Sequence, residues 1–238
     1  MKRIHVVLMF LSALGFCARL GLTQTSPQEQ SDPLQQDLQQ IIQAIAANER
    51  QLQTYQWTES TTVTIKGNST SPKLSICRYA ADGTILKTPL TPATKAKEHG
   101  GPMMRAIAKH EKEKVQGEVE QIYALMQRYV PLDRASLEQA FNTGSVDFEH
   151  DVTGGNAIVL HNYTKPGDEL KIAYDRSNKQ VDRVSVRTYL DKPGDTMTID
   201  VRFAILPDRT LYPALTSVDA PSEKVWISIA DLEFVRAY

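Results

Sequence analysis

The stretch VDRVSVRTYLDKPGDTMTIDVRFAIL, residues 181–206, predicts the fold of this protein. It holds two strand segments, residues 181–190 and 197–206, on either side of a Lys-Pro-Gly-Asp sequence. Proline followed by glycine suits the two central positions of a type II turn, so the stretch predicts a β-hairpin. The same four residues recur at 165–168, where we expect a second hairpin tip.

Strand segments continue on both sides of this hairpin, at intervals of about ten residues. Such spacing is typical of an antiparallel sheet that is built from successive hairpins. The segments from residue 145 onward are 146–152, 157–163, 169–174, 181–190, 197–206, 211–218 and 225–234.

A second block of strands precedes them. Residues 55–66 alternate between two sets of side chains, which predicts a strand covered on one face. Residues 73–79 return, and Asp82-Gly83 is a tight-hairpin signal before residues 84–88. We expect a three-stranded β-meander here.

Two segments have helical periodicity instead. Apolar side chains recur at helical spacing in residues 34–52, after the start signal Asp32-Pro33, and again in residues 104–129. A short helix is expected after Asp133. The sequence therefore predicts an α+β fold, in which an antiparallel sheet of about ten strands wraps on amphipathic helices.

The N-terminus has the pattern of a secretory signal. Lys2 and Arg3 precede an apolar run of about 15 residues, which is shorter than the roughly 20 that span a bilayer as a helix. No later segment approaches that length, so we expect no transmembrane span in the mature chain. We assign residues 1–25 to the signal, 26–33 to a flexible spacer, and 34–238 to one domain with a helical insertion at about 100–142.

Cys17 lies at the end of the apolar run, where Leu14-Gly15-Phe16-Cys17 resembles a bacterial lipobox. That resemblance implies lipidation of the cysteine and anchoring to the outer membrane. Phe16 departs from the pattern, because a lipobox has Gly, Ala or Ser in that place. A plain cysteine of the signal core is the favoured interpretation, and it makes the protein periplasmic or secreted.

Charge and motifs exclude several functional classes. The chain has 27 Lys and Arg against 28 Asp and Glu, with no segment that concentrates positive charge, so nucleic acid is not an expected partner. It lacks the nucleophile elbow, the phosphate-binding glycine loop and the dinucleotide fingerprint, and no cofactor is implied. A hydrolase whose carboxylates come from distant positions stays open as a lesser alternative.

His150 and His161 are weak candidates for a metal site. If residues 153–156 form a four-residue turn, residue 150 lies opposite 159 and residue 161 opposite 148. Both imidazoles would then lie diagonally on one face of the sheet. Two ligands do not make a metal site, so partly buried or rim histidines are favoured, and no metal is expected.

The order of these elements resembles the periplasmic LolA/LolB class of lipoprotein-carrier proteins. The resemblance covers nearly the whole mature chain and rests on element order. It implies an incomplete, strongly curved β-barrel with helices on its concave face and acyl chains between them. Candidate lining residues in the strands are Trp57, Val63, Ile65, Phe203, Ile205, Trp226 and Ile227.

Two functions from different classes fit such a fold, and they differ in whether its centre is hollow. A hollow centre takes a lipid, a lipoprotein acyl chain or another apolar molecule, which is the function we favour narrowly. A filled centre indicates a structural or protein-interaction module of the cell envelope that works through its surface.

Overall fold

A computed structural model describes residues 33–90, 102–132, 134–143, 146–150, 156–175, 177 and 180–237. The chain divides into two units, Met1–Ser31 and Asp32–Tyr238, and every described residue belongs to the second. The expected signal, Cys17 and nearly all of the expected spacer lie outside the described residues.

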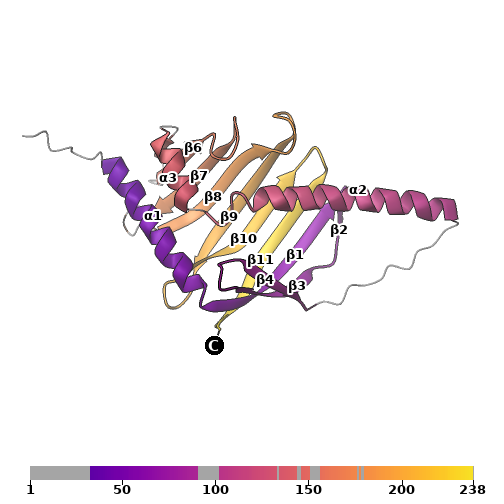
Figure 1. The fold of residues 1–238 in the computed structure, drawn as a ribbon, viewed down its shortest axis with the longest axis horizontal. Coiled ribbons are helices and arrows are strands. Elements are labelled where there is room, and N and C mark those ends of the chain that lie inside the picture. Colours follow the sequence, from indigo (N-terminus) through magenta and orange to yellow (C-terminus); the bar gives the residue numbers. More distant parts are fainter. Residues whose placement is uncertain are drawn as a thin grey trace, which may run out of the picture. The chain divides into compact units, whose positions relative to one another are not determined.

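The second unit is built on one antiparallel sheet of eleven strands, which confirms the predicted fold class (Figure 1). The strands of its first block are β1 (Tyr55–Ile65), β2 (Asn68–Ser69), β3 (Lys73–Tyr79) and β4 (Ile85–Pro89). The later strands are β5 (Val146–His150), β6 (Asn156–His161), β7 (Glu169–Asp175), β8 (Gln180–Tyr189), β9 (Thr196–Ile205), β10 (Leu211–Ala220) and β11 (Val225–Arg236). Strand β2, a short partner of β1, was not predicted.

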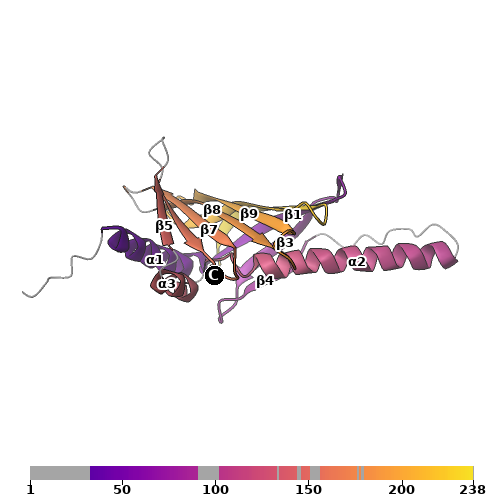
Figure 2. The ribbon, with the colours of Figure 1, turned by 90° about the horizontal axis from the view of Figure 1, so that it is seen from above.

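The strand order is β4-β3-β1-β11-β10-β9-β8-β7-β6-β5, so β4 and β5 are the two edges of an open sheet. Successive strands of the later block are neighbours, as the hairpin spacing predicted. The first long strand, β1, pairs with the last strand, β11, so the two ends of the domain lie side by side in the sheet. The long connection from β4 to β5 passes through α2 (Pro102–Met126) and α3 (Arg134–Asn142) and joins the two edges. The sheet curves around one face, as Figure 2 shows from above.

Three helices of the described part of the chain lie on that side of the sheet, and α2 extends beyond the edge of the sheet (Figures 1 and 2). They are α1 (Pro33–Leu52), α2 (Pro102–Met126) and α3 (Arg134–Asn142). Ile41 and Ile42 of α1 and Ile122 of α2 are buried against the sheet because apolar side chains recur there at helical spacing. Among the described helices, none is both long enough and apolar enough to span a bilayer.

The core lies between these helices and the inward side chains of the strands. On β8 and β9 the inward positions alternate, and Val184 is paired with Val201 and Val186 with Ile199 across the two strands. All four are at most 2% exposed. This alternation explains why the stretch 181–206 folds as a hairpin with one apolar face.

Both Lys-Pro-Gly-Asp sequences form hairpin tips. The Asp168 N–H donates to the Lys165 carbonyl at 3.2 Å, and the Asp195 N–H donates to the Lys192 carbonyl at 2.8 Å. Gly167 has a φ of 79°, as a type II turn requires. Gly194 has no left-handed φ, so the type II prediction is wrong for the second copy. Proline at the second position of a turn suits type I equally well.

Candidate functional site

A cavity of about 1070 Å³ lies between the inner face of the sheet and the helices. Its volume is at the upper end of the range for ligand pockets, about 300–1,000 Å³. Strands β1, β3, β4, β8, β9, β10 and β11 contribute to it, with α1 and the chain that follows α2. Its apolar lining includes Ile45, Leu52, Trp57, Tyr79, Met126, Val130, Val181, Val184, Val201, Phe203, Ile229 and Phe234.

Small side chains of α1 contribute to the open space. Ile41 and Ile42 are fully buried, so long side chains fill the space next to the early part of the helix. One turn later Ala44 and Ala47 line the cavity. Their methyl groups are too short to reach the facing strands, and the space between stays unfilled.

Aromatic rings form one wall of the cavity. Trp57 of β1 stacks on Phe234 of β11 with ring centroids 5.5 Å apart and planes 8° from parallel. Tyr79 of β3 also contacts the tryptophan, with ring centroids 5.5 Å apart and planes tilted by 47°. Trp57 is 5% exposed, so the wall is shielded from bulk water. Such rings offer a large apolar surface to a ligand.

A β-bulge places Phe234 in this wall. Gln56 is paired with Val235 but Thr58 with Leu232, so two residues of β11 stand opposite the single residue Trp57. Glu233 takes the left-handed φ of 53° within the bulge. Because of the extra residue, Phe234 and the residue three positions before it, Asp231, both line the cavity.

The polar end of the cavity lies next to the aromatic wall. Glu59 of β1 is directly opposite Asp231 of β11 and is 9% exposed. Its carboxylate accepts hydrogen bonds from Lys87 Nζ at 2.6 Å and from Thr61 Oγ1 at 3.0 Å. Lys87 lies on β4, so this ion pair reaches across the intervening strand β3. Glu59 is therefore a satisfied buried carboxylate.

Asp231 has a different environment. The pKa of the Asp231 carboxyl is raised to about 7. Burial is the largest cause of this shift, and the negative charge of Glu59 is the second. The Trp57 N–H and the Lys87 charge oppose the shift. The contact between the Trp57 ring and the carboxyl falls outside hydrogen-bond geometry, so neither Trp57 Nε1 nor Asp231 Oδ1 has a hydrogen-bond partner.

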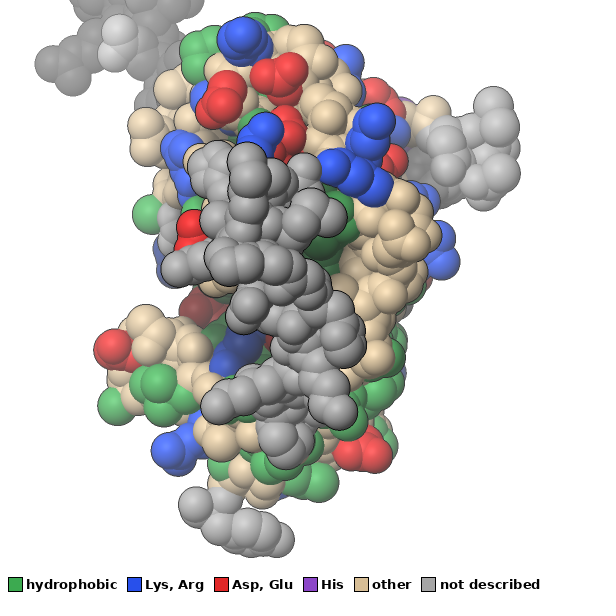
Figure 3. All heavy atoms as spheres, turned by 90° about the vertical axis from the view of Figure 1, so that its right-hand side faces the viewer, with side chains coloured by type: hydrophobic (Ala, Val, Ile, Leu, Met, Phe, Trp, Pro, Cys, Tyr) green, Lys and Arg blue, Asp and Glu red, His purple; other side chains and the backbone are tan. Residues whose placement is uncertain are grey.

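The cavity meets solvent at a group of exposed, charged side chains in its lining. Asp208 accepts hydrogen bonds from Tyr55 Oη at 2.6 Å and from Arg236 Nη2 at 2.7 Å. The pKa of Asp208 is lowered to about 2, and the hydrogen bond from Tyr55 is the largest cause. This group ties β1 and β11 to the β9–β10 turn, next to the aromatic wall. On the face drawn in Figure 3, charged side chains of both signs are intermixed.

Two of the seven predicted lining residues, Trp57 and Phe203, line this cavity. Ile227 lies in the packed core, and Val63 and Ile65 are half-buried against it. The remaining two are largely outside, since Ile205 is 52% and Trp226 is 40% exposed. Trp226 instead borders a smaller hollow of about 430 Å³ next to the β1–β2 turn.

Sequence reasoning missed the polar end of the cavity. Glu59 occupies an odd-numbered position of β1, in step with Tyr55 and Trp57, so its place on the inward face was available as a signal. Asp231 likewise follows Ile227 and Ile229 at a period of two. Phe234 had no such signal, because it depends on the bulge.

Comparison with known proteins gives similarity to solved structures only. No family model matches the chain, and no curated protein matches it. It is similar to a DUF1329 family protein from Desulfovibrio piger, with 10% identity and a TM-score of 0.42, over 87% of this chain and 94% of that one. It is also similar to a LolA superfamily protein from Nitrosomonas europaea, with 9% identity and a TM-score of 0.39, over 83% and 94%. The second belongs to the class that the element order resembles.

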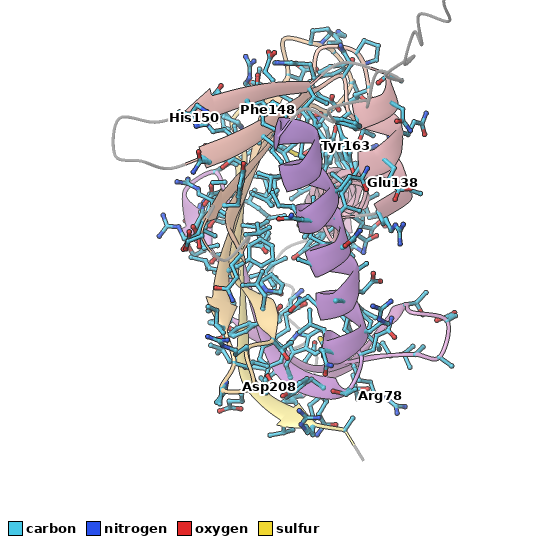
Figure 4. All side chains as sticks on the ribbon, turned by 90° about the vertical axis from the view of Figure 1, so that its left-hand side faces the viewer. Arg78, Glu138, Phe148, His150, Tyr163 and Asp208 are labelled. Atoms are coloured by element: carbon cyan, nitrogen blue, oxygen red, sulfur yellow. The ribbon has the colours of Figure 1, made fainter. Side chains whose placement is uncertain are left out.

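The two histidine candidates do not converge. His150 is paired with Asn156 across β5 and β6, so the connecting loop has five residues and the predicted register is wrong. With this register the two histidines lie on opposite faces of the sheet. His150 Nδ1 is 2.7 Å from Asn156 Oδ1, and His161 Nε2 is 3.0 Å from Asp147 Oδ2. Figure 4 shows His150 at the end of the sheet away from Asp208.

Two further observations concern metal and thiol chemistry. Within the described ranges, no group of three or more His, Cys, Asp or Glu side chains has the arrangement to hold a metal ion. Cys77 of β3 is a fully buried free cysteine. The pKa of its thiol is raised to about 12, mainly by burial. A thiol with this pKa is not a nucleophile near neutral pH.

Proposed function

We propose that this protein is an exported envelope protein that binds a hydrophobic ligand, a lipid or a lipoprotein acyl chain, between its sheet and its helices. The observation that supports this proposal is the cavity of about 1070 Å³ with its aliphatic and aromatic lining. A core of this size normally closes such a space with side chains, because interiors pack as densely as organic crystals.

The energetics of an acyl chain suit this cavity. Each buried methylene contributes roughly 0.8 kcal/mol, so a chain of about twelve carbons gains on the order of 10 kcal/mol. Immobilisation of the ligand offsets part of this gain. The aromatic wall adds rigid contact area, because Trp57 and Phe234 are already stacked before a ligand enters.

The alternative function, an interaction module with a filled core, needs side chains in the space that the cavity occupies. The alanines of α1 leave that space open.

For location, the secretory pattern of residues 1–25 supports a periplasmic or secreted protein, and lipidation of Cys17 would anchor it to the outer membrane. The mass of the purified mature chain distinguishes the two, since an acylated N-terminal cysteine adds the mass of its lipid.

The experiment that tests ligand binding begins with the mature protein purified from envelope extracts without detergent. Organic extraction followed by mass spectrometry is expected to release a lipid in near-stoichiometric amount. The stripped protein is then titrated with a fluorescent fatty acid. An Ile205→Ser variant is the matched control, because Ile205 is an apolar residue that does not line the cavity. A protein that carries no lipid and ignores the fatty acid would overturn the proposal.

A further inference from the structure

The polar end of the cavity has an uneven distribution of charge. Glu59 and Asp231 bring two carboxyl groups to one position of the sheet, and Lys87 pairs with Glu59. Within the described part of the chain, Asp231 has no salt-bridge partner. With Asp231 ionised the group of three carries one net negative charge, inside a largely apolar cavity.

The surroundings of Asp231 also suit a cation. The rings of Trp57, Tyr79 and Phe234 line the same part of the cavity, and the faces of such rings attract cations. Trp57 is only 5% exposed, yet its indole N–H has no hydrogen-bond partner. Two buried polar atoms without hydrogen-bond partners are costly, and they indicate that a further group completes the arrangement.

We propose that the ligand is a cationic amphiphile, whose hydrocarbon chain fills the cavity and whose protonated amine binds the carboxylate of Asp231 beside Trp57. This inference rests on the proposed function, because it names the polar group of the ligand that the same cavity takes. A charge-assisted hydrogen bond of this type is stronger than a neutral one, and it keeps Asp231 ionised so that its contact with the Trp57 N–H improves.

Other polar groups fit less well. A carboxylate or phosphate group would meet two carboxyl groups and one lysine that is already paired with Glu59. A hydroxyl group can accept from the Trp57 N–H, but it leaves the net negative charge unbalanced. The ammonium group is the one that neutralises the site.

Every titratable group near Asp231 enters the pH dependence of binding. They are Glu59 on β1, Cys77 and Tyr79 on β3, Lys87 on β4, Glu49 on α1 and Tyr123 on α2. Burial raises the pKa of Cys77, Tyr79 and Tyr123 to about 12, so these three stay neutral near pH 7. Asp231, with its pKa near 7, changes its charge in this range.

The test compares three probes with the same chain length: dodecylamine, dodecanol and dodecanoic acid, each below its micelle concentration. Calorimetric titration slightly above neutral pH is expected to show dodecylamine binding about tenfold more tightly than dodecanol, or better. Asp231→Asn is expected to remove this preference by weakening the binding of dodecylamine, so that its Kd approaches that of dodecanol for the same variant. Glu233→Gln is the matched control, because Glu233 is an exposed carboxylate of the same strand that lies outside the cavity lining.

The native protein gives a second measurement that needs no variant. The Kd for dodecylamine is expected to weaken about tenfold per pH unit below the pKa of Asp231, with no matching change for dodecanol. Equal affinities for amine and alcohol, or an amine affinity that ignores pH, would overturn the ammonium site while leaving the cavity function intact. Failure of all three probes to bind would instead overturn the proposed function itself.

Discussion

Glu59 of β1 and Asp231 of β11 stand directly opposite each other on paired antiparallel strands, so two carboxyl groups share one place on the inner face of the sheet. Like charges in this relationship destabilise a strand pair. Lys87 compensates Glu59 through a contact of 2.6 Å. The compensation leaves Asp231 as the group that holds a proton near neutral pH, because burial and Glu59 raise its pKa to about 7.

This relationship predicts a stability profile that falls with rising pH. Asp231 has a pKa near 7 in the folded protein against an ordinary value of 3.8, so the folded state binds the extra proton between these values. The free energy of unfolding therefore decreases as pH rises through this window, by a few kcal/mol at most. Urea unfolding of the stripped protein at a series of pH values measures the slope.

The variant that checks the assignment is Asp231→Asn. It is expected to flatten the profile, with stability close to that of the native protein at about pH 4 and clearly higher at about pH 8. Glu233→Gln, on the exposed side of the same strand, is expected to keep the native slope. An Asp231→Asn protein that is less stable than the native one at every pH would contradict the assignment.

A second prediction separates the hollow part of the interior from its packed part. Val184 and Val186 are inward neighbours on β8, 1% and 2% exposed, but only Val184 lines the cavity. Val184→Phe places its ring in empty space, so we expect weaker ligand binding with little loss of stability. Val186→Phe overfills a packed site and is expected to cost about 1–3 kcal/mol. Urea unfolding and fatty acid titration of both variants give the comparison, and equal destabilisation would show that no usable space exists beside Val184.

The sequence predicts those parts of the fold that depend on local periodicity. The hairpin of residues 181–206 followed from a period of two with turn residues between, and α1 followed from apolar side chains at helical spacing. Register was less accessible, because the β5–β6 pairing depends on whether the strands are joined by the four residues 153–156, as predicted, or by the five residues 151–155. One residue of difference moves a side chain to the other face.

The site was harder to predict than the fold, for a physical reason. Whether an interior is hollow depends on side chains from separate elements that fail to meet, such as Ala47 of α1 and Val201 of β9. No single stretch of sequence carries that information. Trp57 and Phe203 line the cavity because each is a large apolar residue on an inward position of the covered face. Ile205 has the same character but lies at the end of β9, beyond that cover.

A third prediction concerns the two Lys-Pro-Gly-Asp tips, which differ in what their aspartates contact. Asp168 is 2% exposed and accepts hydrogen bonds from Tyr129 Oη at 2.6 Å and from the backbone of Thr164 and Lys165 at 3.0 and 2.9 Å. Asp168→Ala removes the common acceptor of these three hydrogen bonds, including the buried one from Tyr129, and is expected to cost about 3 kcal/mol or more. Denaturant unfolding gives the value.

The second tip supplies the matched control for that change. Asp195 is only half-buried and closes its turn through its backbone N–H, which a substitution retains. Asp195→Ala is therefore expected to shift the free energy of unfolding by about 0.5 kcal/mol or less. If both alanine variants lose the same stability, the Tyr129 contact is not what distinguishes the tips.

The last prediction uses the two tryptophans of the chain as separate reporters. Trp57 lines the cavity and is 5% exposed, whereas Trp226 is 40% exposed and borders a different hollow. In a Trp226→Phe variant all indole emission comes from Trp57, so a brominated fatty acid that enters the cavity is expected to quench it. In Trp57→Phe the same titration is expected to leave the emission of Trp226 nearly unchanged. Quenching confined to Trp57→Phe would place the ligand at the outer hollow, because bromine quenches indoles only at close contact.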